Sequence, residues 1–419
     1  MIVKDPSPEA WNTVRRYASW MRQVRVDGGP ALREDAFRKL RLNSPPGGWF
    51  PALEGISWCI TTSDLPYADL LFSPQLKSIS ISVSRTWVDS EVPRHILPFI
   101  ASTISALPTS ALEHLFVSLS YRKMPWAYFK DSLSSVILRC GPSFKEFTSP
   151  IPLSDTAVNH LIRLPHLRTW RVQDPPPSYS ASSLPPVFPP LTEFTLGGGA
   201  ARGWISLFKR IEGGIPITQD ATPLSEVGKS LKTLMIENLI GLIDVSFTSP
   251  IQIFWNLVNL NVEAYCHDEF KQGQCNFKLN NDHVAELAMA LPQLELLLLG
   301  RPCFENSCAT TVACLLPISI HCIKLHKLEI HFNTTNIIND LKDVLEDPLF
   351  QELRSLPRCK LSCLNAGQIP LVLNNAGFET LANGMINIFP SLDWCNGRKK
   401  WYELSERIEH LREVWTRHQ

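Results

Sequence analysis

Long apolar segments, net charge and clustered cysteines are all missing from this sequence of 419 residues. The most apolar stretches, Leu294–Leu299 and Val312–Ile320, are shorter than the roughly 18 residues that span a bilayer. The 40 basic and 40 acidic side chains give a formal net charge of zero, which disfavours a protein held to nucleic acid by a basic surface. We therefore expect neither a membrane nor a nucleic-acid partner.

The cysteine pattern does not predict a disulfide framework. The 11 cysteines are an odd number spread along a long chain, which favours reduced thiols in the cytosol or nucleus. The first residues, Met1 to Pro6, also lack the apolar core of a secretory signal. The sequence thus predicts a cytoplasmic or nuclear protein.

Recognisable catalytic motifs are missing as well. The chain has no G-x-S-x-G elbow, phosphate-binding P-loop, H-E-x-x-H pair or Cys/His nucleophile signature. We therefore expect a protein that is not an enzyme and that uses no cofactor. An enzyme on an α/β fold is the weaker alternative, because active sites can assemble from distant residues.

Two local patterns imitate binding sites. The glycine-rich run from Phe194 to Trp204 is similar to a dinucleotide fingerprint, but no second strand with an acidic residue follows at the required distance. A tight turn between repeats is the preferred interpretation. The second pattern is a group of cysteines and histidines: Cys303, Cys308, Cys314, Cys322, His321, His326 and His331. These residues lack the paired spacing of a zinc site, so we expect no bound metal.

One short pattern recurs throughout the chain: an apolar residue, two variable residues, a second apolar residue, one variable residue and a third apolar residue. Leu112-Glu-His-Leu115-Phe-Val117 and Leu231-Lys-Thr-Leu234-Met-Ile236 are clear copies. The alternation at its end predicts a half-buried strand. Copies recur every 23 to 40 residues or so, close to or longer than the spacing of leucine-rich repeats. Further copies begin at Leu53, Leu76, Leu167, Leu191, Leu257, Leu294 and Leu325, with weaker ones at Gly141–Phe147 and Leu361–Asn365.

Several segments between the copies have helical periodicity. Asp155–Leu164 is one predicted helix, with Ser154 as its N-cap, and Asn281–Leu291 is a second. Each ends at a Leu-Pro pair, after which the next strand begins, because proline cannot continue the helix. These units predict an α/β fold: an irregular leucine-rich-repeat solenoid with a curved parallel sheet, outer helices and helical ends.

The ends predict a three-part organisation. Residues 1–48 read as a helical cap with two amphipathic helices, Pro8–Val26 and Ala31–Leu42. The first of them has Trp11, Val14, Ala18 and Met21 on one side. Residues 49–395 form the solenoid, and 396–419 form a C-terminal capping helix over Arg398–His418. The apolar stripe of that last helix comprises Trp401, Leu404, Ile408, Leu411 and Trp415.

Residues 174–190 form a loop rich in proline and serine. Within it, Pro176-Pro177-Ser-Tyr179 matches the Pro-Pro-x-Tyr ligand of WW domains, which bind preformed polyproline helices. An inert linker is the preferred interpretation, because such a match arises easily in a proline-rich loop.

The irregular repeats, the Leu-Pro breaks and the tryptophan-rich last helix together resemble the F-box/leucine-rich-repeat proteins of mushroom-forming fungi. The segment Trp11-Asn-Thr-Val-Arg-Arg-Tyr-Ala-Ser-Trp-Met-Arg-Gln-Val-Arg25 resembles the stretch that follows the F-box in that family. The resemblance implies the substrate-receptor part of an SCF-type ubiquitin ligase, which binds an unknown protein substrate. A leucine- and proline-rich F-box should precede Trp11, and these 419 residues contain no recognisable one. The alternative is an F-box-less repeat scaffold unrelated to ubiquitin.

The repeat pattern predicts which side chains face a partner. Residues at the third, fifth and seventh positions of a copy point away from the core, because side chains alternate along a strand. The candidate partner-binding residues are His114, Phe116, Thr169, Arg171, Gln173, Met235, Glu237, Asn259, Asn261, Glu263, Lys327, Glu329 and His331.

The missing F-box gives a second expectation. The helices predicted within residues 1–48 are heavily charged, so we expect them to cover the first repeat and not to form an obligate interface of their own. Residues 1–419 alone should therefore not bind the ligase adaptor, which becomes a partner only if an F-box lies upstream. Met1 would then be an internal start or the start of a truncated gene model.

Overall fold

The computed structural model divides into two compact units, Met1–Leu191 and Thr192–Gln419. The division falls within the predicted solenoid, directly after the proline- and serine-rich loop of residues 174–190. The residues that the structure describes are 7–26, 34–46, 48–60, 65–83, 97–118, 126–173, 190–197, 205, 229–239, 243–264, 277–300, 308–353, 358–366, 371–396 and 399–417.

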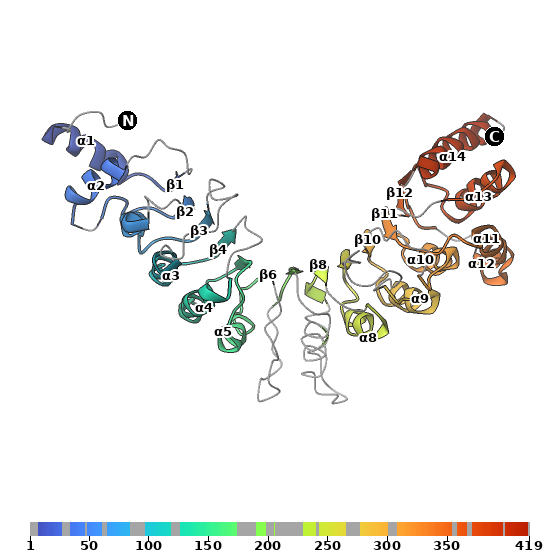
Figure 1. Cartoon of the computed structure of the whole chain (residues 1–419), viewed down its shortest axis with the longest axis horizontal. Helices are drawn as coiled ribbons and strands as arrows, with labels where there is room; N and C mark the ends of the chain where they lie inside the picture. Colours follow the sequence, from blue (N-terminus) through green and yellow to red (C-terminus); the bar gives the residue numbers. More distant parts are fainter. Residues whose placement is uncertain are drawn as a thin grey trace. The chain divides into compact units, whose positions relative to one another are not determined.

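The first unit alternates strands with helices or 3-10 turns. Its strands are parallel and pair in chain order, and the helices form a second layer along one side of the sheet (Figure 1). The strands are β1 (Gln23–Val26), β2 (Gly55–Ile60), β3 (Ser78–Val83), β4 (His114–Ser118), β5 (Glu146–Ser149) and β6 (Thr169–Gln173). The helical elements are α1 (Pro8–Ala18), α2 (Glu34–Leu42), η1 (Leu65–Leu71), α3 (Leu97–Ser105), η3 (Trp126–Phe129), α4 (Lys130–Arg139) and α5 (Asp155–Leu161).

The second unit follows the same plan, again with parallel strands in chain order. Its strands are β7 (Glu193–Gly197), β8 (Thr233–Leu239), β9 (Asn259–Ala264), β10 (Leu296–Leu299), β11 (Lys327–Ile330), β12 (Cys363–Asn365) and β13 (Trp394–Asn396). Its helical elements are α8 (Val245–Thr248), η4 (Ser249–Ile253), α9 (Asn281–Ala290), η5 (Val312–Cys314), α10 (Leu315–His321), α11 (Ile337–Glu346), α12 (Pro348–Leu353), α13 (Asn375–Ile388) and α14 (Lys399–Arg417).

The apolar positions of the repeat form the core. Leu112, Leu115 and Val117 of one copy are each at most 1% exposed, and the corresponding residues of the other copies are also buried. Burial of one such side chain contributes about 1.5–3 kcal/mol, so the stacked copies stabilise one another. The predicted α/β leucine-rich-repeat solenoid is therefore the observed fold, as the pattern of buried residues and the parallel register show.

A repeated backbone contact sets the register. The carbonyl of the second residue in a copy accepts hydrogen bonds from two N–H groups of the next copy. The Glu54 carbonyl, for example, accepts from Lys77 at 2.8 Å and Ser78 at 3.0 Å. The same pair of bonds recurs in later repeats, for example from Glu113 to the Lys77 carbonyl. Each copy is thereby aligned with its neighbour to within one residue.

The predicted helices form, but two end earlier than expected. Ser154 caps α5 by accepting a hydrogen bond from the Ala157 N–H, as predicted, and α5 ends at Leu161. The helix predicted over Pro8–Val26 is wrong in its second half, because α1 ends at Ala18 and Gln23–Val26 is strand β1, paired with β2. The segment Met21-Arg-Gln-Val24-Arg-Val26 has the spacing of a repeat copy, and β2 supplies the hydrogen-bonding partner that makes it a strand.

The last helix packs on the end of the sheet, with α14 contacting β13 and α13. Trp401, Leu404 and Ile408 are fully buried, as expected from the stripe, and the Trp401 ring lies 5.9 Å from that of Phe332. The buried Ser405 hydroxyl accepts a hydrogen bond from the Cys395 N–H at 2.7 Å and donates one to the Cys395 carbonyl at 2.9 Å. A side chain of α14 thus satisfies backbone groups of β13, the last described strand.

Candidate protein-binding surface

The strand register arranges the outward residues of each unit in columns. In the first unit, one column runs from Gln23 through Gly55, Ser78, His114 and Glu146 to Thr169. The next column runs from Arg25 through Ser57, Ser80, Phe116 and Thr148 to Arg171. We call these two columns the first strand face. Phe116 and Arg171 lie on it two strands apart, with Thr148 between them.

The predicted residues of the first unit occupy this face. Phe116 is 42% exposed and Arg171 is also exposed, whereas His114 and Thr169 are half-buried. His114 Nδ1 lies 3.1 Å from Glu146 Oε2 on the neighbouring strand. The side chain of Gln173 lies outside the described residues. An exposed aromatic ring near a histidine that contacts a carboxylate suits an interface that combines apolar burial with hydrogen bonding.

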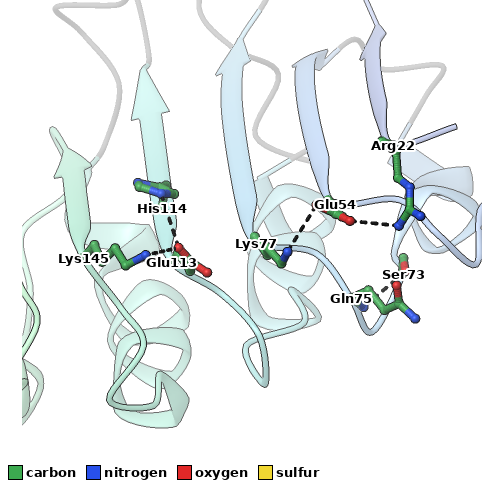
Figure 2. Close-up of polar contacts among 8 residues, drawn as sticks. All are labelled: Arg22, Glu54, Ser73, Gln75, Lys77, Glu113, His114 and Lys145. Atoms are coloured by element: carbon green, nitrogen blue, oxygen red, sulfur yellow. Dashed lines mark hydrogen bonds and ion pairs between the residues drawn. The ribbon is translucent and has the colours of Figure 1, made fainter.

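A line of alternating charges borders the first strand face. Arg22, Glu54, Lys77, Glu113 and Lys145 each stand one residue before a member of the first column. The Arg22 Nη1 to Glu54 Oε1 distance is 2.8 Å, Lys77 Nζ lies 3.2 Å from Glu54 Oε2, and Lys145 pairs with Glu113 (Figure 2). The pKa of Glu54 is lowered, mainly by the hydrogen bond from Lys77, and that of Glu113 mainly by the bond from Lys145. We call these five residues the charge ladder.

The second unit has its own strand face, formed by β7 to β13. Met235, Glu237, Asn259, Glu263, Lys327 and Glu329 are half-buried there. Asn261 and His331, by contrast, are only 6% and 3% exposed, so the expectation that they contribute open surface is corrected. Alternation along a strand predicts the direction of a side chain and not how deeply its neighbours bury it.

Burial changes the electrostatics of the second face. It raises the pKa of Glu329, and the nearby Glu263 carboxylate acts in the same direction, while a hydrogen bond from Asn365 and the charge of Lys327 oppose the shift. The Asn261 amide donates to Glu263 Oε1 at 3.4 Å, and its buried Oδ1 has no hydrogen-bond partner among the residues that the structure describes.

The sequence reasoning omitted several residues of both faces. Arg25, Ser57, Ser80 and Thr148 belong to the first face, and Leu296, Leu298, Asn365 and Trp394 belong to the second. The repeat spacing is enough to locate Ser57, Ser80, Leu296 and Leu298, because they stand at the outward positions of the copies that begin at Leu53, Leu76 and Leu294. Trp394 is 49% exposed and packs edge-on against Tyr402 of α14 at 5.8 Å.

Cysteine and histidine side chains do not converge in the described residues, where no three His, Cys, Asp or Glu side chains are grouped as metal ligands would be. Burial raises the pKa of Cys322 to about 12, and its thiol donates to the Ala288 carbonyl of the preceding repeat at 3.7 Å. Cys303, most of the glycine-rich run and the Pro176, Pro177 and Tyr179 motif lie outside the described residues. None of the described helices is long and apolar enough to cross a bilayer.

Comparison with known proteins gives matches among solved structures. No protein-family model matches the sequence, and no curated protein does. A leucine-rich-repeat protein of Leptospira interrogans is 13% identical, with 95% of this chain and 96% of that chain covered and a TM-score of 0.37. The leucine-rich repeat-containing protein LegL7 of Legionella pneumophila is 7% identical, with 90% and 91% covered and a TM-score of 0.32. At these TM-scores, the fold assignment rests on the strand register and the buried repeat positions described above.

Proposed function

We propose that this chain recognises another protein through its strand faces and serves as the substrate-receptor part of an SCF-type ubiquitin ligase. The observation that carries recognition is the first strand face, where the exposed Phe116 ring and the Arg171 side chain stand among polar and small neighbours. Aromatic and arginine side chains dominate the binding energy of protein interfaces. The ligase role is supported by the sequence resemblance alone.

The recognition proposal is tested with a captured partner. The immobilised chain is used to purify binding proteins, which are identified by mass spectrometry and then prepared in pure form. Phe116→Ala and Arg171→Ala should each weaken binding by at least about 1 kcal/mol, or roughly fivefold in Kd. Leu138→Ala, which removes a 45% exposed side chain from helix α4 of the same unit, is the matched control and should leave Kd unchanged. Equal binding by both face variants would place the site on a loop or on another surface.

The ligase proposal has a separate test. Purified 1–419 is mixed with the ligase adaptor and passed over a size-exclusion column, and we expect no co-elution. A product of the same gene that includes an upstream F-box should co-elute. A complex with 1–419 alone would contradict the requirement for the F-box, whereas a transcript without an F-box frame would favour the scaffold unrelated to ubiquitin.

A further inference from the structure

Helix α1 and the turn after it expose a line of apolar side chains. Val14, Tyr17, Trp20 and Met21 are 38%, 53%, 64% and 43% exposed. With the exposed Ala10, Val14 and Tyr17 follow the spacing 10, 14 and 17 along the helix, and Trp20 and Met21 lie in the turn after it. Intervals of four and three residues are those by which one helix packs along another.

The neighbouring side of α1 is already used by the fold. Trp11 and Ala18 are buried, and the Trp11 ring lies 5.5 Å from that of Trp49. Trp49 in turn donates from Nε1 to the Leu40 carbonyl at 2.7 Å. The predicted single stripe of Trp11, Val14, Ala18 and Met21 is therefore divided, because its first and third members face the domain while Val14 and Met21 stay exposed. Counting the charges of this segment does not reveal its second apolar side.

One cation lies on this exposed line. The Arg16 guanidinium carbon is 5.5 Å from the Tyr17 ring centroid and 6.0 Å from that of Trp20. Among the described residues, Arg16 contacts no carboxylate, whereas Arg22 pairs with Glu54 and Arg41 with Asp69. The aromatic faces therefore hold an arginine charge that the surrounding acidic residues do not neutralise.

We propose that Ala10, Val14, Arg16, Tyr17, Trp20 and Met21 form a docking face for an amphipathic helix of a partner protein whose apolar seam is flanked by aspartate or glutamate. The apolar line would pack against the partner seam, and Arg16 would bind a flanking carboxylate bidentately. This inference goes beyond the proposed function, because it uses α1 and not the strand faces.

The charge pattern favours this occupant over two others. A second copy of the chain would bring a second Arg16 to the same symmetric contact, and like charges disfavour that arrangement. Anionic membranes attract segments with clusters of roughly four to eight basic residues, whereas residues 8–21 carry two, Arg15 and Arg16, and the following Arg22 pairs with Glu54.

The test uses displayed peptides as probes. A library of helices about three heptads long carries leucine at the seam positions and Glu, Gln or Lys at the flanking positions. Selection on the purified chain should enrich peptides with excess Glu beside the seam. Their affinity should fall at least tenfold for Tyr17→Ala and for Trp20→Ala, and selection on Arg16→Glu should enrich Lys instead. The control is Leu42→Ala, which removes a 78% exposed side chain from α2 and should not alter binding.

Four results would overturn the proposal. They are the absence of enrichment, enrichment without charge bias, binding to phosphatidylserine vesicles in place of peptides, and a dimer in sedimentation that Trp20→Ala dissociates. All substituted side chains are exposed, so the variants should unfold at the same temperature as the parent chain, and circular dichroism checks this directly.

Discussion

Lys77 donates a hydrogen bond to Glu54 across neighbouring repeats, with 3.2 Å between Lys77 Nζ and Glu54 Oε2. Both residues occupy the second position of their repeats, so the contact joins equivalent points of two adjacent copies. The Glu54 carboxylate also binds Arg22 of the preceding copy, which makes it a bridge among three repeats. The charge ladder therefore links neighbouring repeats through the side chains of the same residues whose backbone carbonyls accept hydrogen bonds from the next repeat.

Glu113→Gln should destabilise the first unit in a pH-dependent way. The substitution removes the ion pair with Lys145, which is worth roughly 0.2–1 kcal/mol because Lys145 is largely exposed. The folded-state pKa of Glu113 is lowered, so this stabilisation is present above the unfolded pKa and is lost as the pH falls through the folded pKa. Urea unfolding of the parent and variant at pH 7 and in acid measures the difference. An equal difference at both pH values would show that the charge plays no part.

Gly384→Ala should destabilise the second unit although alanine favours helices. A Cβ at this position of α13 would lie 2.8 Å from Leu341 Cγ on α11, well inside contact distance. Overpacking costs about 1–3 kcal/mol, which outweighs the gain of about 1 kcal/mol in helix propensity. Denaturant titration should therefore show a net loss of stability.

The coupling between the two positions gives the control. Leu341→Ala opens space for the new methyl group, so the double variant should be more stable than the sum of the single effects predicts. Gly141→Ala, where a Cβ meets nothing within 4 Å, should be close to neutral. Strict additivity of the Gly384 and Leu341 changes would contradict the predicted overlap.

Ser405→Ala should loosen the last strand. The substitution removes both hydrogen bonds between the Ser405 hydroxyl and the backbone of Cys395, a fully buried residue. Leaving buried polar groups unpaired costs about 1–3 kcal/mol. Hydrogen exchange at the Cys395 amide should become faster, and the unfolding midpoint should fall. Ser391→Ala is the matched control because Ser391 is exposed. Unchanged exchange at Cys395 would mean that water replaces the hydroxyl without loss.

Thiol labelling should distinguish folded from unfolded chain. Burial raises the pKa of Cys140, Cys322, Cys359 and Cys395 to about 12, so their reactive thiolate forms are scarce at pH 8. Maleimide should label these residues slowly in the native protein and rapidly in urea, as peptide mass spectrometry can measure. The half-buried Cys59 provides the comparison within the same sample. Native labelling of all five at one rate would show that the repeats open readily.

The sequence by itself determined the repeat and the direction of its side chains. The alternation of Leu115 and Val117 is enough to predict a strand with one buried side, and Leu112, just before the strand, is buried as well. The same logic places Phe116 and Arg171 outward. Local signals also predicted the Ser154 cap and the buried stripe of α14, since capping and helical periodicity depend on residues close in the chain.

Only the tertiary structure decided which outward residues are accessible and which segments pair. Asn261 and His331 are only 6% and 3% exposed, and no spacing rule predicts that burial. Gln23–Val26 became a strand because β2 offers a partner, although a helical reading of the same residues was also possible. The exposed apolar side of α1 likewise depends on tertiary structure, because the packing of Trp11 against Trp49 decides which side of the helix faces the domain. The Lys77–Glu54 contact depends on the register between neighbouring repeats. Burial and strand pairing arise only when several elements pack together, so the sequence of a single segment does not predict them.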